Sequence, residues 1–170
     1  MANVFIVSDT HFGHQNICKF TKGDGTKLRP WDDVADMDEF MVDAWNSVVR
    51  PSDKVYHLGD VVINRKALGI VGRLNGKKRL IRGNHDIFST REYMQYFDEI
   101  YGVRVLADMI LSHIPLHEQS VTQRFNCNVH GHLHSVDLPS VNHLCVCVER
   151  TDFRPIDLDE VRARIAAKRG

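Results

Sequence analysis

Short apolar runs that end in polar, metal-ligating side chains constrain this sequence more than any other feature. The first run, Val4–Val7, leads directly into Ser8 and Asp9, which predicts a buried strand with a polar side chain at its carboxyl end. Carboxylate, amide and imidazole groups recur in this way along the chain, and these groups bind borderline or hard divalent cations. Six such islands occur: Asp9-Thr10-His11, Gly59-Asp60, Gly83-Asn84-His85-Asp86, Ser112-His113, Gly131-His132 and His134.

Strand and helix patterns alternate in the first half of the chain. Residues 33–49 carry apolar side chains three and four apart, which indicates an amphipathic helix, and Pro51 follows as a stop signal. Further strands are predicted at 54–58 and 78–81, and helices at 67–74 and 91–97. Short strands then follow at 102–106, 109–111, 127–129 and 144–148, before a charged helix at 159–168. This order predicts an α/β sandwich with a mixed sheet system, in which residues 1–170 form one domain.

Length and composition limit the classes of function. A chain of 170 residues buries about two-thirds of the surface that its unfolded form exposes, so it needs neither disulfides nor a structural metal to fold. Its 22 basic residues balance 22 acidic ones, so no basic field attracts a nucleic-acid backbone. We therefore do not expect an extended nucleic acid as a partner, although a nucleotide could enter a local site.

The cysteines and the N-terminus point to a reducing compartment. Cys18, Cys127, Cys145 and Cys147 form no CxxC pair, and the last two lie two residues apart in an apolar run. We expect reduced, buried thiols, with Cys145 and Cys147 on one face of a strand. The N-terminus lacks the features of a secretory signal, and no apolar run is long enough to cross a bilayer. The sequence therefore favours a cytoplasmic protein with no membrane partner.

The spacing within the islands predicts that side chains share cations. Asp9 and His11 are two residues apart, so both leave the same face if the backbone stays extended there. His132 and His134 repeat this alternation. The two oxygens of Asp60 could bridge two metals, and two cations about 3.5–4 Å apart can activate a water and stabilise the attacking and leaving oxygens of a displacement at phosphorus.

The island at 83–86 combines a candidate ligand with candidate catalytic residues. Asn84 supplies a neutral amide oxygen, while His85 beside it projects in another direction and stays free to donate a proton. We expect Asp86 to orient the His85 ring by accepting a hydrogen bond from its second nitrogen, which would raise the basicity of the imidazole. His113 would complete the second metal site.

Residues near the islands are candidates for binding the substrate. His14 follows His11 by three residues and could reach a phosphate, or could instead stabilise its own loop. Arg82 and Arg29 are candidate phosphate clamps because a guanidinium offers a planar fork to phosphate oxygens, and their alternative role is surface charge. His57 is expected to be a core or supporting residue.

Each of these residues alone also has an ordinary structural explanation. Asp and Asn at strand ends often form turns or cap helices, and a lone His113 would be a hydrogen-bonded interior histidine. Ten histidines among 170 residues are well above ordinary usage, however. The recurrence of the islands, and no single residue, therefore favours a metal centre.

In order and spacing, the islands resemble the signature of the calcineurin-like metallophosphoesterases. The resemblance spans residues 4–150, and the strings DTHFGHQNI, VYHLGDV, RGNHD and VCVERTDFRPIDLDEV are similar to those of small, single-domain members from bacteria and their viruses. It implies a four-layer αββα sandwich, with two mixed sheets flanked by helices and a dinuclear metal centre at the strand ends.

The same resemblance implies the roles of the site residues. One metal would be held by Asp9, His11, Asp60 and His134, and the other by Asp60, Asn84, His113 and His132. His85 would be the general acid that protonates the leaving oxygen, or would stabilise the charge that develops on it. A metal-bridging hydroxide would be the nucleophile, without a covalent enzyme intermediate. Two divalent ions are thus expected; the mixed nitrogen and oxygen ligands favour Mn(II), with Fe, Zn, Ni or Mg as alternatives.

The expected function is a divalent-metal-dependent phosphoesterase that hydrolyses a phosphodiester in a small phosphorylated substrate such as a nucleotide. A phosphomonoesterase acting on nucleotides, sugars or phosphoprotein is the alternative activity. A non-catalytic binding scaffold of the same fold is a third alternative, against which the complete ligand set argues. The natural substrate and the oligomeric state stay open at this level.

Overall fold

The computed structural model describes residues 2–122 and 124–170 of the chain. Its first sheet contains the strands β1 (Val4–Val7), β2 (Lys54–His57), β3 (Lys77–Ile81), β4 (Glu99–Tyr101) and β9 (Ile156–Asp157). Their order is β4-β3-β2-β1-β9, with β1 to β4 parallel and β9 antiparallel to β1. The carboxyl ends of β1, β2 and β3 therefore meet at one edge of the sheet, where three of the islands begin.

The second sheet contains β5 (Val103–Leu106), β6 (Met109–Ser112), β7 (Cys127–His130) and β8 (His143–Cys145) in that order. Strand β5 is antiparallel to β6, whereas β6, β7 and β8 run parallel. His113 and Gly131 therefore follow the carboxyl ends of two neighbouring strands.

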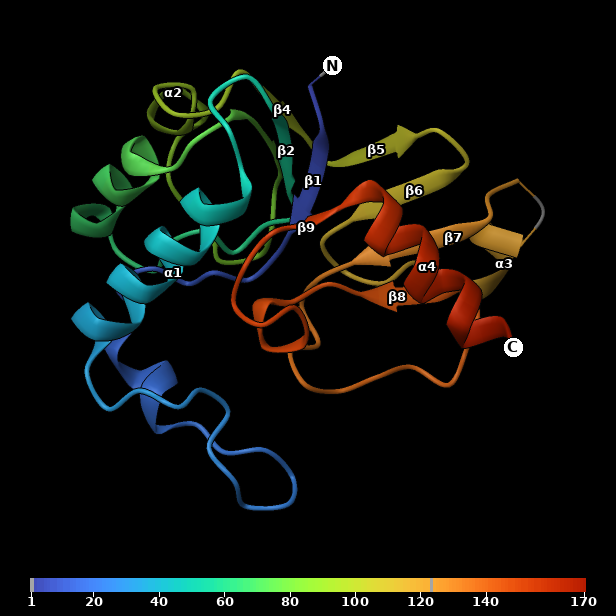
Figure 1. Cartoon of the computed structure of the whole chain (residues 1–170), viewed down its shortest axis with the longest axis horizontal. Helices are drawn as coiled ribbons and strands as arrows, with labels where there is room; N and C mark the ends of the chain where they lie inside the picture. The colour runs from blue at the N-terminus through green and yellow to red at the C-terminus, as the bar shows by residue number, and fades with distance from the viewer. Residues whose placement is uncertain (1, 123) are drawn as a thin grey trace.

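Helices flank the two sheets (Figure 1). Helix α1 (Val34–Val48), the 3-10 helix η2 (Arg65–Arg73) and α2 (Thr90–Tyr93) lie on the side of the first sheet that faces away from the second. Helix α3 (Glu118–Thr122) contacts β7, and α4 (Leu158–Arg169) contacts β1 and β9. The predicted αββα sandwich with two mixed sheets is confirmed. Within the described residues, no helix has the length and apolar character needed to span a membrane.

Strand β1 separates two apolar cores because alternate side chains of a strand face opposite ways. Phe5 and Val7 belong to the core beneath α1, together with the fully buried Trp45. Ile6 belongs to the core between the sheets, together with Leu111 of β6. Both cores pack against the same short strand, and this packing fixes the position of the chain at Asp9.

The segment after β8 ties the two sheets together beside this strand end. The backbone N–H of Val146 donates to the carbonyl of His130 in the second sheet, over 2.9 Å. Two residues later, the N–H of Val148 donates to the carbonyl of Ser8 in the first, over 3.1 Å. The site that these strand ends form is therefore shared by both sheets.

Several predicted elements have different ends or a different type. Residues 67–74 lie mostly within a 3-10 helix, not an α-helix, and only the start of the segment 91–97 is α-helical. The predicted strand at 144–148 ends at Cys145, because Val148–Arg150 form the 3-10 helix η3. Strands β4 and β9 and the 3-10 helix η1 (Gln15–Lys19) were not predicted, since two- to five-residue elements show too little periodicity.

Candidate metal centre

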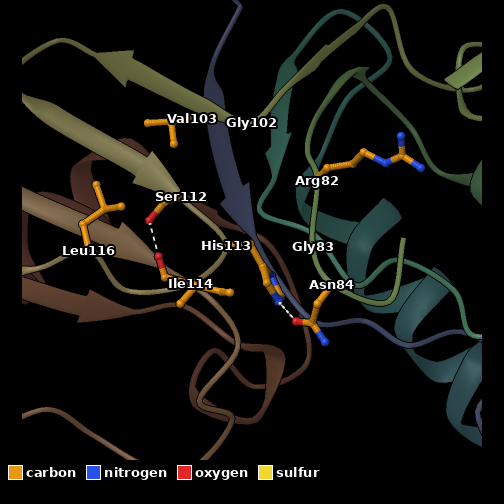
Figure 2. A pocket seen from close by; sticks show the side chains of 9 residues that line it. All are labelled: Arg82, Gly83, Asn84, Gly102, Val103, Ser112, His113, Ile114 and Leu116. Carbon is orange, nitrogen blue, oxygen red and sulfur yellow. Dashed lines mark hydrogen bonds between the residues drawn. The ribbon is translucent and has the colours of Figure 1, made fainter. Parts of the chain in front are cut away.

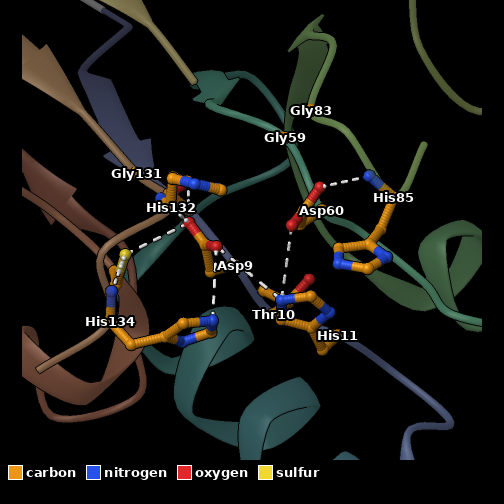
Figure 3. Close-up of polar contacts among 12 residues, drawn as sticks. Asp9, Thr10, His11, Gly59, Asp60, Gly83, His85, Gly131, His132 and His134 are labelled. Carbon is orange, nitrogen blue, oxygen red and sulfur yellow. Dashed lines mark hydrogen bonds and ion pairs between the residues drawn. The ribbon is translucent and has the colours of Figure 1, made fainter. Parts of the chain in front are cut away.

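The islands converge where the carboxyl ends of the two sheets meet (Figure 3). Each ligand candidate lies in a loop that follows the carboxyl end of a strand, and some of these loops carry two candidates. Asp9 and His11 follow β1, Asp60 follows β2, Asn84 follows β3, His113 follows β6, and His132 and His134 follow β7.

Asp9, His11, Asp60 and His134 surround one side of the centre. The Nε2 atom of His11 lies 3.7 Å from Asp9 Oδ1 and 3.5 Å from Asp60 Oδ2. The Nε2 atom of His134 lies 3.8 Å from the same Asp9 oxygen. Nitrogen and oxygen atoms at these separations could bind one cation placed between them.

Asp60, Asn84, His113 and His132 surround the other side. The Nε2 atom of His113 lies 3.4 Å from Asp60 Oδ2 and 2.9 Å from Asn84 Oδ1. Ligand atoms of Asp60, His113 and His132 lie within 4.8 Å of one another. The Oδ2 atom of Asp60 thus faces both groups, which is the position of a bridging ligand.

The hydrogen bonding of these atoms fits bound cations. Among the described residues, Asp9 Oδ1 and both ring nitrogens of His11 are buried without a hydrogen-bond partner. Buried polar atoms are otherwise almost always paired, because an unpaired one costs about 1–3 kcal/mol. A cation between them would satisfy Asp9 Oδ1 and one nitrogen of His11 together.

Asp9 is fixed through its other oxygen. Oδ2 accepts hydrogen bonds from Ser8 Oγ at 2.5 Å, the backbone N–H of His132 at 2.9 Å and Cys147 Sγ at 3.2 Å. Burial by itself would raise the pKa of Asp9, but the nearby imidazole of His11, at 3.7 Å, and the neighbouring His113 and His134 lower that pKa well below its usual range. Asp9 is therefore an anion with one oxygen held and one free.

The backbone at the ligands is left-handed. Asp9 and His11 have φ values of 59° and 50°, and Asp60, His132 and His134 have 56°, 69° and 51°. The extended backbone on which the shared strand face of Asp9 and His11 depended is therefore not present, because tight turns follow the strands. Non-glycine residues in this region cost of order 1–3 kcal/mol each and cluster at functional sites. The turns aim the side chains of each pair at the centre without the alternation of a strand.

Glycines allow the loops to approach each other closely. A Cβ atom on Gly59 would lie 2.5 Å from the backbone nitrogen of Gly83, and one on Gly131 would lie 2.3 Å from Asp9 Oδ2. No side chain fits at either position, so each glycine is required by the contact between two islands.

Hydrogen bonds to Nδ1 orient two of the histidines. His113 Nδ1 donates to the carbonyl of Leu58 at 2.7 Å, and His134 Nδ1 lies 3.0 Å from Glu149 Oε1. In both rings Nε2 is then left to face the centre, as a metal-ligating histidine requires. Glu149 was not predicted as a site residue; its position in the string VCVER after an apolar run was the available signal.

Arg29 lies beneath the centre and does not reach a substrate, contrary to the prediction of a phosphate clamp. It is fully buried, and its guanidinium donates to the carbonyls of Asp9 at 2.6 Å and Thr10 at 2.7 Å. It also pairs with Glu149 Oε1 at 2.7 Å. Arg29 therefore holds the loop after β1 and the partner of His134.

Asp86 supports the loops and does not orient His85, contrary to the prediction. Its buried carboxylate accepts hydrogen bonds from the backbone N–H groups of Asp60 at 2.8 Å, Val61 at 3.0 Å and Gly83 at 2.7 Å. Burial raises the pKa of Asp86. Asp86 thus ties the island after β3 to the island after β2.

Arg82 is also engaged by the protein. Its guanidinium donates to the carbonyl of Asp86 at 2.7 Å and to the carbonyl of Phe88, and it stacks over the ring of Tyr93. These contacts stabilise the loop after β3 and leave few guanidinium N–H groups free to bind a phosphate. The structure therefore does not favour the predicted role of Arg82 in phosphate binding.

His85 and His14 lie on the accessible side of the centre. The exposed His85 ring is centred 5.6 Å from the ring of His11, and its backbone N–H donates to Asp60 Oδ1 at 2.8 Å. The half-buried ring of His14 is centred 5.7 Å from that of His11, while its Nδ1 accepts a hydrogen bond from the N–H of Ile17. His14 therefore caps η1 and also borders the centre.

His57 is the supporting residue that the sequence suggested. It is buried, its Nε2 lies 3.0 Å from Thr10 Oγ1, and its Nδ1 accepts from the N–H of Gly59 at 3.2 Å. Burial lowers the pKa of His57 to about 3, so the ring is neutral and joins the loops after β1 and β2.

The predicted buried, free thiols are confirmed for all four cysteines. Cys145 and Cys147 lie close together, with their sulfur atoms 3.4 Å apart. Burial raises the pKa of Cys147, which keeps the thiol protonated as a donor to Asp9. The contact between Cys147 and the centre was not predicted, because it depends on the crossing between the two sheets.

Comparison with known proteins identifies the family. The model of the calcineurin-like phosphoesterases matches residues 2–158, so the chain belongs to this family. It is 33% identical over 175 residues to an uncharacterized protein of Methanocaldococcus jannaschii, covering 94% of this chain and 89% of the relative. The gene 66 protein of Mycobacterium phage D29 is 29% identical over 168 residues, covering 79% of this chain and 80% of the relative.

A solved structure supports the fold. The crystal structure of AQ665, a protein of unknown function from Aquifex aeolicus, aligns with a TM-score of 0.70 and 25% sequence identity, covering 96% of this chain and 99% of the other. The family consists of phosphoric ester hydrolases that typically depend on two metal ions, in agreement with the clustered ligands found here.

Replacing Arg29 tests its supporting role. Arg29→Met leaves Glu149 buried without its cation, and we expect a loss of about 3–5 kcal/mol in the free energy of unfolding. The matched control is Arg73→Met, which breaks an exposed ion pair with Glu39 and should change stability far less because solvent screens that pair. Urea denaturation measures both. Equal, small effects would show that Arg29 does not hold the fold.

The lowered pKa of His57 predicts a pH dependence of stability. Between about pH 6.5 and 3 the unfolded chain protonates His57 and the folded chain does not, so this residue makes stability fall as the pH falls. In His57→Gln the slope of the unfolding free energy against pH should decrease in this window by about 1 kcal/mol per pH unit. Denaturation of the metal-free proteins from pH 6 to 4 measures it, with the exposed His117→Gln as control. Identical slopes in His57→Gln and wild type would contradict the assignment.

Proposed function

We propose that this protein is a phosphodiesterase that uses two divalent cations, Mn(II) foremost, to hydrolyse a small phosphodiester such as a nucleotide derivative. The proposal treats residues 1–170 as one catalytic domain. The ligands would be Asp9, His11, Asp60 and His134 for one cation and Asp60, Asn84, His113 and His132 for the other.

The observation that carries this proposal is the position of Asp60 between two groups of ligand atoms. One of its oxygens lies 3.5 Å from His11 Nε2 and 3.4 Å from His113 Nε2. The other accepts the N–H of His85, which keeps the carboxylate from rotating. A carboxylate held in this way supports two adjacent cations better than one.

The bound cations would supply Lewis acidity and an activated water for attack at phosphorus. The protein would contribute the remaining steps. His85 is exposed and borders the centre, so it would donate a proton to the leaving oxygen. His14, whose ring is centred 5.7 Å from that of His11, would bind a phosphoryl oxygen. Because Asp86 and Arg82 fix the loop that bears His85, the acid would be positioned before the substrate binds.

The His85→Ala variant tests the role of the acid. The purified protein with Mn(II) should hydrolyse bis-p-nitrophenyl phosphate, and His85→Ala should lose about 100-fold or more in kcat while elemental analysis still finds two metals per chain. His117→Ala, which removes an exposed histidine away from the centre, is the matched control and should keep wild-type activity.

The outcomes separate the parts of the proposal. Undiminished turnover in His85→Ala would remove that residue from the acid role. A wild-type protein that binds fewer than two metals, or that hydrolyses p-nitrophenyl phosphate faster than the diester, would contradict the dinuclear phosphodiesterase.

A further inference from the structure

A cavity of about 340 Å³ opens beside the metal centre, between the loop after β3 and the ends of β5 and β6 (Figure 2). This volume lies at the lower end of the range of about 300–1,000 Å³ that is typical of small-molecule sites. The residues that line it are Arg82, Gly83, Asn84, Gly102, Val103, Ser112, His113, Ile114 and Leu116.

The wall of the cavity away from the centre is apolar. Val103, Ile114 and Leu116 contribute aliphatic side chains, and Val103 and Ile114 are 46% and 52% exposed. The free energy falls when an apolar ligand removes exposed aliphatic groups of a concave surface from water. The cavity therefore favours a ligand group with an apolar surface.

Two polar side chains of the lining, those of Ser112 and Arg82, already have hydrogen-bond partners within the protein. The hydroxyl of Ser112 donates to the carbonyl of Ile114 at 2.7 Å and accepts from the side chain of Asn128 at 2.9 Å. The guanidinium of Arg82 extends away from the other lining side chains and binds backbone carbonyls of its own loop (Figure 2). A sugar or a second phosphate would thus lose its water and gain no partner from Ser112 or Arg82, which disfavours both as occupants.

Two lining residues connect the cavity to the reaction centre. Asn84 and His113 are at once part of its wall and candidate ligands of the second cation, with Asn84 Oδ1 and His113 Nε2 only 2.9 Å apart. A phosphorus atom bound at the centre would therefore carry one of its ester groups to the mouth of the cavity.

The position of His85 indicates which ester group that is. His85 does not belong to the lining; its ring lies beside Asp60 and near His11, with the centres of the two rings 5.6 Å apart (Figure 3). The leaving oxygen must lie next to the acid, so the group in the cavity is the other substituent of the phosphorus, which stays attached to phosphate in the product.

Resting on the proposed function, we propose that this cavity binds the retained ester group of the phosphodiester and selects an uncharged, apolar group the size of a single ring. A monoester has no retained group and leaves the cavity empty. The cavity thereby supplies a physical reason for the enzyme to prefer diesters.

A series of diesters with one leaving group tests this inference. Phenyl p-nitrophenyl phosphate and methyl p-nitrophenyl phosphate both release p-nitrophenolate and differ only in the retained group. In the Mn(II)-loaded wild type we expect the phenyl ester to have a KM at least about tenfold lower with similar kcat, because the ring binds equally in the ground and transition states.

Two variants remove this preference and one matched variant keeps it. Val103→Asn places a neutral polar group in the cavity wall, and Gly102→Leu fills the cavity, where a Cβ would meet no atom within 4 Å. The control is Val105→Asn on the same strand, at a residue that is 49% exposed and outside the lining. The ratio of KM values for the methyl and phenyl esters should fall to about one in the first two and stay at the wild-type value in the control.

Binding of non-hydrolysable ligands gives a readout apart from turnover. By calorimetry, phenylphosphonate should bind the wild type and Val105→Asn at least about tenfold more tightly than methylphosphonate, and this difference should vanish in Val103→Asn and Gly102→Leu.

The results that would overturn the inference differ from those that would overturn the proposed function. A ratio of methyl to phenyl KM near one in the wild type would show that the cavity does not bind the retained group. A wild-type ratio that is unchanged in Val103→Asn and Gly102→Leu would show the same. Neither result contradicts the proposed phosphodiesterase activity. If Val103→Asn and Gly102→Leu raise the KM for p-nitrophenyl phosphate as much as the KM for the phenyl diester, the cavity binds the leaving group. The assignment of the cavity to the retained group is then wrong. If the metal-loaded wild type hydrolyses neither diester, the proposed function fails, and the inference fails with it.

Discussion

Asp9 and Asp60 place two carboxylates almost completely out of solvent, at 0% and 2% exposure, where the two sheets meet. A buried anion is tolerated only where donors and cations surround it. Around Asp9 these donors come from positions as far apart in the sequence as Ser8, His132 and Cys147. The left-handed turns, the close glycine contacts and the crossing segment after β8 all serve to bring such donors together.

A second group of charges lies beneath the centre and holds its geometry. Arg29 joins the carbonyls after β1 to Glu149, and Glu149 in turn orients His134. On the opposite side, Asp86 joins the loops after β2 and β3. These groups are buried and saturated with protein partners, so their role is to fix the ligands in place. Asn84, His85 and His14 are more exposed, and the proposed function assigns the substrate chemistry to this side of the centre.

The accessible side of the centre is itself divided. His85 and His14 lie around His11, whereas the apolar cavity begins at Asn84 and His113. If the substrate is a phosphodiester, as proposed, the two sides of the centre would offer its two ester groups different surroundings: the imidazole of His85 for one and aliphatic walls for the other. Asp60 connects them, because its Oδ2 atom lies 3.5 Å from His11 Nε2 and 3.4 Å from His113 Nε2.

The sequence by itself determined the strands that precede the islands, the sandwich and the identity of the clustered side chains, because apolar runs and the residues after them are local features. It also suggested the supporting role of His57. It assigned Arg29, Arg82 and Asp86 to substrate or catalysis, and it omitted Glu149 and Cys147. Only the tertiary structure decided these roles, since they depend on contacts such as that between Arg29 and Glu149, 120 residues apart. Whether a charged side chain faces the substrate or lies beneath the site is set by which segments fold over it, and no local pattern encodes that burial.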